Sequence, residues 1–191
     1  FKTHFNYEKH ITVIYNYPNK VGQRAPETEN IREKIGFTKY DFVLIFQGTL
    51  NHGRGLLILL KAMQKLDRPN IKLMIIGGGP LLQEITSRVN KNKIQDKVKI
   101  LGKIDSQELY KYTNAANCGI NLLEDINLSK KYTTATKMFE YFQAELPVIC
   151  SETIENKNIL KVFNSGLLTK NTVKSLKENI INDFYLTPDY F

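Results

Sequence analysis

The sequence predicts an α/β fold: a Rossmann-like, doubly wound parallel sheet with helices on both faces. Short, nearly continuous apolar runs alternate along the chain with amphipathic helical patterns. Strands of this composition are buried on both faces, as they are in parallel sheets that helices cover on each side. Glycine-rich or polar segments follow several of the runs. Because ligands bind at the carboxyl edge of such sheets, we expect the functional residues there.

The expected strands are apolar runs that are bounded by turn residues. In chain order they are FVLIF at 42–46, IKLMII at 71–76, VKIL at 98–101, CGINLL at 118–123 and PVIC at 147–150. A weaker strand signal lies near 166–168.

Helical periodicity separates these strands. We expect helices at about 55–66, 81–90, 106–115 and 134–144, with a weaker pattern at 172–182. Pro80 suits the first turn of the second helix. Asp105 and Ser106 are rival N-caps of the third helix, and Glu108 forms a capping box with Asp105, so these acids are expected to be structural.

The residues before 40 predict a different organisation. ITVIY at 11–15 has the pattern of a short strand, and the polar stretch 19–30 has the composition of a linker. We therefore divide the chain into an N-terminal strand and linker from a preceding domain, residues 1–39, and a globular unit, residues 40–191. The sequence is expected to be a piece of a longer protein.

Composition narrows the functional classes. The chain has 191 residues, 42% of them apolar, and a formal net charge of +8, so it can bury a core and has a basic surface. The basic residues are scattered and no nucleic-acid-binding signature accompanies them, so we expect a solvated basic face or attraction to an anionic membrane surface, and no nucleic-acid partner. No apolar run reaches the length that spans a bilayer.

The cysteines and histidines predict no metal site. Cys118 and Cys150 lie in apolar runs without a metal-like partner, which indicates buried free thiols in a reducing, cytoplasmic compartment. The three histidines lack paired spacing, and only His52 lies in a segment that is typical of a site.

The segment TTATKMFEYFQAELPV at 133–148 is the most informative in the chain. It places Lys137 and Glu140 three residues apart on one helical face. Thr134 and Thr136 lie where the helix begins, with free backbone N–H groups at the positive end of the dipole, which favours phosphate. A cation and an acid beside such a position indicate a nucleotide diphosphate with a ribose or sugar attached. The alternative is an exposed Lys137–Glu140 ion pair.

Three other loops follow strands. QGTLNHGRG at 47–55 allows its backbone to approach a ligand while Arg54 supplies a cation, although it is neither a Walker loop nor a GxGxxG fingerprint and could be an ordinary glycine-rich turn. Gly79 ends a glycine turn that could approach a sugar or phosphate. Ile104 could offer its backbone groups to a nucleobase.

Five segments in this order resemble the nucleotide-sugar-binding half of GT-B glycosyltransferases, specifically the retaining group 1, or family 4, enzymes. They are VIYNYPN at 13–19, FQGTLNHGRGLLILLKAM at 46–63, LMIIGGGP at 73–80, VKILGKIDSQELYKYTNAANCGINLL at 98–123 and TKMFEYFQAELPVICSE at 136–152. The resemblance implies a C-terminal Rossmann-like domain, residues 40–191, that binds a nucleotide diphosphate sugar. It also implies a separate N-terminal acceptor domain that this sequence lacks, and no obligatory metal or other cofactor.

Site residues are carried over from the resemblance by position. Arg54 matches the basic residue that grips the diphosphate, Lys137 matches the lysine of the family's Pro-Asn-Lys-Leu-Phe-Glu/Asp-Tyr variant, and Glu140 matches the acid that binds the ribose; these three are the expected catalytic groups. The expected donor-binding residues are Gly48, Thr49, Gly53, Gly79, Ile104, Thr134 and Thr136, the last in place of an asparagine.

The sequence departs from the family pattern at three positions. Tyr132 stands where relatives carry the first of two glutamates, so another group must hold the sugar. Thr49 replaces a second phosphate-binding arginine, and Glu145 replaces a glycine before the PVIC strand.

The resemblance implies a domain that binds the donor for transfer of a hexose to a glycan or lipid-linked acceptor, as in bacterial surface polysaccharide synthesis. The protein would then be cytoplasmic, in peripheral contact with the inner face of the membrane, and the isolated fragment would show little turnover. The alternatives are a non-catalytic nucleotide-sugar-binding or scaffold module, and an epimerase or phosphorylase of the same architecture.

Overall fold

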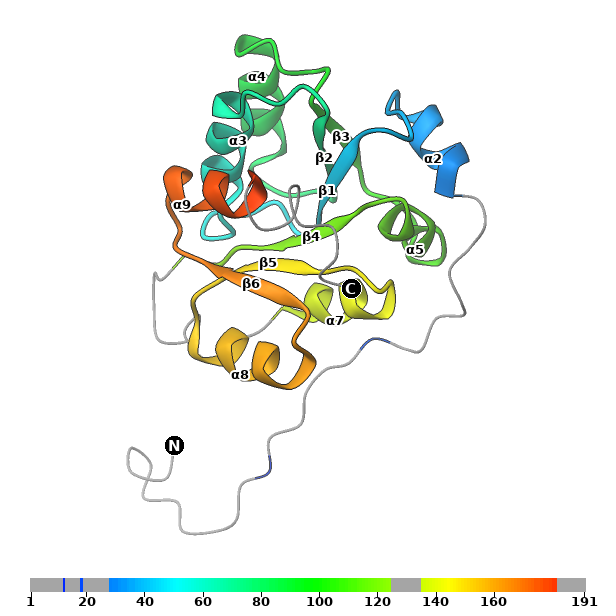
Figure 1. The fold of residues 1–191 in the computed structure, drawn as a ribbon. Coiled ribbons are helices and arrows are strands. Elements are labelled where there is room, and N and C mark those ends of the chain that lie inside the picture. Colours follow the sequence, from blue (N-terminus) through cyan, green and yellow to red (C-terminus); the bar gives the residue numbers. More distant parts are fainter. Residues whose placement is uncertain (1–11, 13–17, 19–27, 125–134, 182–191) are drawn as a thin grey trace.

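A six-stranded parallel sheet forms the centre of the molecule in the computed structural model, which describes residues 12, 18, 28–124 and 135–181. The strand order is β3-β2-β1-β4-β5-β6, and every neighbouring pair is parallel (Figure 1). The strands are β1 (Phe42–Gln47), β2 (Ile71–Ile76), β3 (Val98–Gly102), β4 (Cys118–Asn121), β5 (Val148–Ser151) and β6 (Gly166–Thr169). This architecture confirms the predicted α/β fold class.

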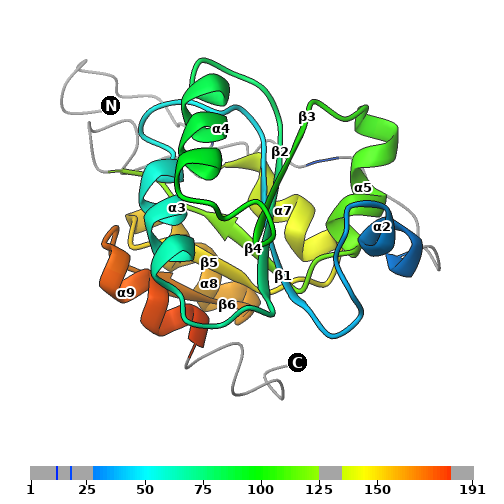
Figure 2. The ribbon, with the colours of Figure 1, turned by 90° about the horizontal axis from the view of Figure 1, so that it is seen from above.

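Helices cover both faces of the sheet. They are α2 (Thr28–Lys34), α3 (Leu56–Lys65), α4 (Leu82–Lys91), α5 (Ser106–Asn114), α7 (Thr136–Gln143), α8 (Ile154–Phe163) and α9 (Val173–Glu178). Apolar residues of α3, α4 and α9 pack in one core cluster, and those of α5, α7 and α8 pack in the other. Figure 2 shows α3 and α4 on one side of the strands and α2 and α5 on the other.

The two cores are separated by the alternation of side chains along the strands. Leu44 and Phe46 of β1 point into the core under α3, while Val43 and Ile45 point into the core under α7. All four side chains are buried. A strand that is buried on both faces must be apolar at every position, which is why the sequence shows runs rather than alternation.

The strands and helices expected between residues 42 and 150 agree with the structure to within about two residues at each end, the usual uncertainty of helix and strand boundaries. Helix α8 was not predicted. Its apolar residues Ile154, Val162 and Phe163 are exposed, so they do not form the one-sided stripe that identifies an amphipathic helix. Phe163 instead stacks on Phe142 of α7.

The stretch before residue 40 differs from the linker expected there. Helix α2 begins at Thr28, inside the expected linker, and packs against α5. Arg32 donates hydrogen bonds to the carbonyl oxygens of Ala115 and Asp41 and to Asn117 Oδ1, at 2.7, 3.3 and 2.8 Å. The buried Phe37 joins the core. The expected strand at 11–15 lies almost wholly outside the described residues, and the division into 1–39 and 40–191 stays a prediction.

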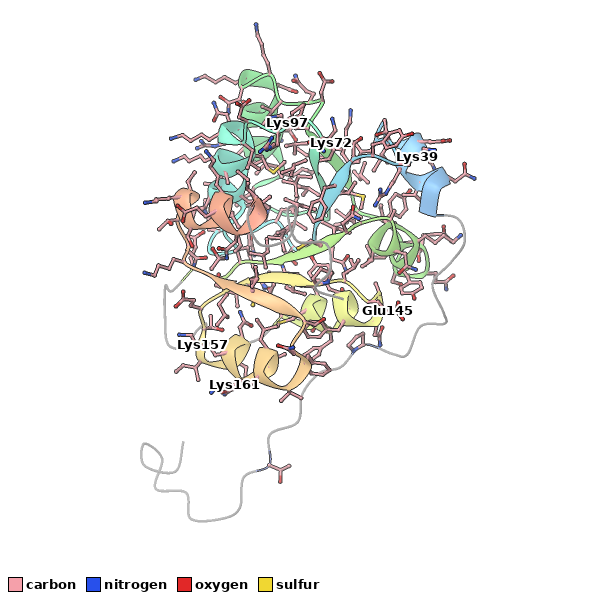
Figure 3. The ribbon with its side chains drawn as sticks, in the orientation of Figure 1. Lys39, Lys72, Lys97, Glu145, Lys157 and Lys161 are labelled. Carbon is pink, nitrogen blue, oxygen red and sulfur yellow. The ribbon has the colours of Figure 1, made fainter. Side chains whose placement is uncertain are left out.

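The surface lysines are spread over the molecule. Figure 3 shows Lys39 near α2, Lys72 and Lys97 near β2, and Lys157 and Lys161 on α8. These five lysines are divided among separate parts of the described structure. Within the described ranges, none of the helices combines the length and the apolar character that a membrane span requires.

Candidate functional site

A cavity of about 330 Å³ opens where the loop after β1 meets the first turn of α7. Its lining includes six of the ten residues that the sequence predicted for a site. The lining residues are Gln47, Gly48, Thr49, Arg54, Ala135, Thr136, Lys137 and Glu140. Arg54 lies in the loop after β1, and Glu140 lies in α7, after β4. The two residues therefore face the same cavity although three strands separate them along the chain.

The loop after β1 is fixed by close packing against the loop after β2. Gly77 has a φ of +142°, and a Cβ atom there would lie 1.8 Å from the carbonyl oxygen of Gly48. The Gly48 amide donates to the carbonyl of Ile76 and the Leu50 amide donates to that of Gly78. Only glycine allows this approach, so these residues hold Gly48 and Thr49 at the cavity.

Arg54 lies at a turn that a carboxylate holds in place. Glu124, just after β4, accepts a hydrogen bond from the Gly55 amide at 3.1 Å, and its own amide donates to the Gly53 carbonyl at 3.0 Å. Gly55 caps α3 with a left-handed φ of 66°, and a Cβ atom there would clash with Leu122. The guanidinium of Arg54 is half-buried and makes no hydrogen bond or ion pair within the described part of the chain.

Lys137 is a buried cation without a polar partner. Its side chain is 7% exposed, and Nζ makes no hydrogen bond to any described residue. The ammonium lies 3.6 Å from the centre of the Phe46 ring, a cation–π contact that compensates only part of its lost hydration. Burial lowers the pKa of Lys137 well below its usual range, the Arg54 charge lowers it further, and Glu140 opposes them. An anion in the cavity would reverse this shift.

Glu140 is held by β1 rather than by Lys137. Its Oε2 accepts a hydrogen bond from Gln47 Nε2 at 2.5 Å, and the Gln47 Oε1 lies 2.9 Å from the hydroxyl of Thr113. No ion pair joins Lys137 and Glu140 among the described residues. The alternative interpretation of an exposed Lys137–Glu140 ion pair is therefore wrong, because Lys137 is buried and Glu140 is hydrogen-bonded to Gln47.

A second pocket, of about 290 Å³, adjoins the cavity at Glu140. Glu140 and Gln47 line both pockets, so they form the wall between them. The other lining residues of the second pocket are Pro18, Ser106, Gln107, Leu109, Tyr110, Thr113 and Gln143. A ligand with one anionic and one neutral polar part could therefore occupy both pockets with its junction beside Glu140.

Four predicted site residues do not line the cavity. Gly53 is buried behind Arg54, and a Cβ atom on Gly79 would contact the Leu50 backbone, so its turn geometry accounts for the glycine. Ile104 packs against the core that α7 covers. Thr134 lies outside the described residues, as does Tyr132. His52 is exposed and is not among the residues that line either pocket.

The start of α7 has no side-chain cap from its N-cap residue. Helix α7 begins at Thr136, its N-cap is Ala135, and the Met138 amide donates to the Ala135 carbonyl at 3.0 Å. Uncapped N–H groups and the helix dipole favour negative charge at this end. Together with Arg54 and Lys137, they make the cavity suited to a phosphate group.

Sequence reasoning missed the residues that support the site. Gln47, Thr113, Glu124 and Tyr141 were not singled out. The Tyr141 hydroxyl accepts from the Gln47 amide at 3.1 Å and lies 3.3 Å from the Ile45 carbonyl, and burial raises its pKa. The only sequence signal for Gln47 is a polar side chain at the end of an apolar strand.

The cysteines are buried free thiols. Burial raises the pKa of Cys118, and it raises that of Cys150 to about 12, so both are protonated at neutral pH. No group of three histidine, cysteine or acidic side chains that could bind a metal ion occurs in the part of the chain that the structure describes.

Comparison with known proteins points to one family. The family model described as Glycosyl transferases group 1 matches residues 27–183. An uncharacterized glycosyltransferase of Methanocaldococcus jannaschii is 30% identical over 115 residues, which cover 58% of this chain and 30% of that protein.

Solved structures share the fold. Anabaena HepE in complex with UDP-glucose superposes with a TM-score of 0.72 at 17% identity, over 87% of this chain and 45% of HepE. WaaG, a glycosyltransferase involved in lipopolysaccharide biosynthesis, gives a TM-score of 0.69 at 17% identity, over 86% of this chain and 44% of WaaG. The catalytic domain of cholesterol-alpha-glucosyltransferase from Helicobacter pylori gives 0.59 at 18% identity, over 78% of this chain and 94% of that domain. The chain thus spans less than half the length of HepE, WaaG and the Methanocaldococcus protein.

Proposed function

The chain belongs to the group 1 glycosyltransferases, and from this premise we propose that residues 40–191 form the domain that binds a nucleotide diphosphate sugar donor. The observation that carries the proposal is the cavity in which Arg54 and the buried Lys137, whose ammonium has no hydrogen-bond partner among the described residues, face Glu140. Two cations and the positive end of α7 match a diphosphate, and a carboxylate at the junction of two pockets matches the hydroxyls of the adjoining ribose.

Each part of the proposed site has a distinct role in transfer. Arg54, Lys137 and the first turn of α7 stabilise the negative charge that develops on the nucleotide diphosphate as the glycosidic bond breaks. Glu140 accepts hydrogen bonds from the ribose and so fixes the nucleotide. The sugar itself would face the open side of the domain, where a separate acceptor domain would complete the active site. No metal or cofactor is required in this scheme.

We extend the proposal to the whole protein. It would transfer a hexose, with retention of the anomeric configuration, to a glycan or lipid-linked acceptor. The reaction would belong to bacterial surface polysaccharide synthesis on the cytoplasmic side of a membrane. Support comes from relatives: WaaG acts in lipopolysaccharide biosynthesis, and HepE was solved with UDP-glucose. The isolated chain would bind its donor with little turnover.

Calorimetry tests donor binding directly. The chain is titrated with UDP, GDP, ADP and CDP, with their glucose conjugates, and with inorganic pyrophosphate. We expect one nucleoside diphosphate and pyrophosphate to bind, with the nucleotide the tighter. The matched control is Arg88→Ala, which removes an arginine that pairs with Glu84 on α4, away from the cavity. Absence of binding to every ligand at millimolar concentration would disprove the proposal.

A non-catalytic nucleotide-sugar-binding module is the second candidate. Tyr132 favours it, because the resemblance places an acid that contacts the sugar at that position. Donor hydrolysis by a longer protein that includes an acceptor domain separates the two candidates, since a degenerate module binds the donor and does not hydrolyse it.

A further inference from the structure

We infer that Gln47 is a positioning residue that, together with Thr113, orients Glu140 toward the ribose of the nucleotide. The inference rests on the proposed function and goes beyond it by assigning the group that sets the direction of the carboxylate. Gln47 is the last residue of β1 and is 1% exposed, and its side chain spans from α5 to α7.

The chemistry of the three side chains fixes the orientation of the Gln47 amide. A carboxylate only accepts hydrogen bonds, so the amide NH₂ must face Glu140 Oε2. The amide oxygen then faces Thr113, whose hydroxyl lies 2.9 Å from it and 3.0 Å from the Leu109 carbonyl. When the Thr113 proton is donated to Gln47, both ends of the amide are satisfied and the amide cannot flip without losing both bonds.

The backbone of Gln47 is fixed as well. Its amide donates to the hydroxyl of Tyr141, the residue that follows Glu140 on α7. A Cβ atom on Gly119 would lie 2.3 Å from the Tyr141 ring, so this ring packs directly on β4. Gln47 is therefore connected to α7 by its main chain and by its side chain, and the two connections set the distance and direction of Glu140.

The position of Glu140 gives this arrangement a consequence for ligand binding. Its carboxylate lies in the wall between the 330 Å³ cavity with the cations and the 290 Å³ pocket. Gln47 bonds Oε2, and no other described residue is hydrogen-bonded to this carboxylate, so Oε1 can accept from a ribose hydroxyl. A carboxylate with a fixed direction loses less conformational entropy when it binds that hydroxyl, so the orientation strengthens recognition of the ribose and not of the phosphates.

The test compares ribose recognition with phosphate recognition. Binding of UDP, 2′-deoxy-UDP, 3′-deoxy-UDP and inorganic pyrophosphate is measured for the wild type and for Gln47→Met, which keeps the side-chain length and removes both polar ends. The corresponding guanosine, adenosine and cytidine compounds are included because the base is unidentified. We expect the wild type to prefer the ribonucleotide over a deoxy analogue by about tenfold, the scale of one hydrogen bond to a charged group.

In Gln47→Met we expect this preference to fall to about twofold while pyrophosphate binding stays within about fivefold of the wild type. Thr113→Val should reduce the preference to about threefold to fivefold, because it leaves the amide oxygen of Gln47 without its donor. The matched control is Thr86→Val on α4, which removes a hydroxyl that bonds the Leu82 carbonyl four residues earlier, as Thr113 does with Leu109.

Gln47→Glu adds a readout that a purely structural role would not change. Two carboxylates in contact share one proton at low pH and repel when both are ionised. The cations that face them are Arg54 and Lys137, and Tyr141 stays protonated. We expect the ribose preference of this variant to be absent at pH 8 and to return toward pH 5, while the preference of the wild type changes little.

The outcomes separate the two proposals. A wild type that binds neither nucleotides nor pyrophosphate overturns the proposed function and this inference together. A wild type that prefers ribonucleotides, with the preference unchanged in Gln47→Met and Thr113→Val, overturns the inference alone. If Gln47→Met does not fold, Thr113→Val and the pH dependence of Gln47→Glu decide.

Discussion

The two walls of the cavity are built in opposite ways. On the cationic wall, formed by Arg54 and Lys137, one ammonium is buried without a hydrogen-bond partner and one guanidinium makes no ion pair within the described residues. On the carboxylate wall, formed by Gln47 and Glu140, polar atoms are hydrogen-bonded to one another and to the helix behind them.

This contrast shows that the cationic wall lowers the stability of the folded state, whereas the carboxylate wall does not. A buried, unpaired ammonium destabilises the folded state, and a ligand that supplies the missing negative charge recovers that cost on binding. A carboxylate that is already held needs no rearrangement to accept a hydroxyl. The cationic wall should therefore supply most of the affinity, and the carboxylate wall most of the selectivity.

The largest effect is expected from Lys137→Met. Loss of the ammonium should weaken pyrophosphate binding by about 2–5 kcal/mol, as when one partner of a buried charge pair is removed. The same change should raise the free energy of unfolding by about 1–4 kcal/mol, the range seen when buried charged groups are replaced by hydrophobic ones. Calorimetry and urea denaturation measure the two quantities. Lys161→Met, at an exposed position on α8, is the control. A less stable variant that still binds pyrophosphate would contradict the contrast.

Arg54→Ala should give the next largest loss. Removing one charge-assisted hydrogen-bond donor should cost about 1.5–3 kcal/mol of diphosphate affinity. Stability should change little, because Arg54 is half-buried and the turn is held by Glu124 and Gly55. The measurement is calorimetry with pyrophosphate and UDP, with Arg88→Ala as the control. Equal affinity in Arg54→Ala and the wild type would remove Arg54 from the cationic wall.

Glu140→Gln should have a smaller and more selective effect. The variant keeps the shape of the side chain and loses the charge, so we expect nucleoside diphosphate affinity to fall by about 1–2 kcal/mol, the difference between a hydrogen bond to a charged group and one to a neutral group. Pyrophosphate affinity should be equal or greater, because a negative charge near the phosphates is gone. A larger loss for pyrophosphate than for UDP would place Glu140 on the phosphate side and contradict the assignment.

A separate effect is expected on the pH dependence of stability. The pKa of Lys137 is lowered in the folded state, whereas in the unfolded state it has its ordinary value of 10.5. Between these two pH values the unfolded state binds more protons than the folded state. The free energy of unfolding should therefore rise with pH between the lowered value and 10.5, by at most about 1.4 kcal/mol per pH unit from this one group. In Lys137→Met this contribution disappears, so the difference between the two stability curves should narrow as pH rises. A constant difference from pH 7 to 10 would show that Lys137 keeps its ordinary pKa.

The sequence predicted the central part of the fold because the strands from 42 to 150, apart from the partly buried edge strand β3, are buried on both faces and leave continuous apolar runs. The sequence placed the candidate residues after strands without giving the strand order. In the structure β1 and β4 are neighbours and α7 packs on β4, which brings Arg54 and Lys137 to one edge of the sheet. The sequence did not predict α8, whose apolar residues are partly exposed.

The support of the carboxylate could not be predicted. Gln47 and Thr113 are 66 residues apart, and Gln47 and Glu140 are 93 apart. Their contacts depend on the register of β1 against its neighbours and on side-chain rotamers, neither of which leaves a periodic pattern. The burial of Lys137 could not be predicted either, because its position in the sequence is equally compatible with a surface ion pair.

Helix α2 has a practical consequence for any truncated version of this domain. A fragment cut at Tyr40, where sequence alone sets the boundary, would lack Arg32 and Phe37. The oxygen atoms that Arg32 now bonds on Ala115 and Asn117 would lose this donor, and the apolar surface under Phe37 would be open to water. Such a fragment should precipitate more readily than one that starts upstream of Thr28, and its defect would arise at residues that precede β4 rather than at the cavity.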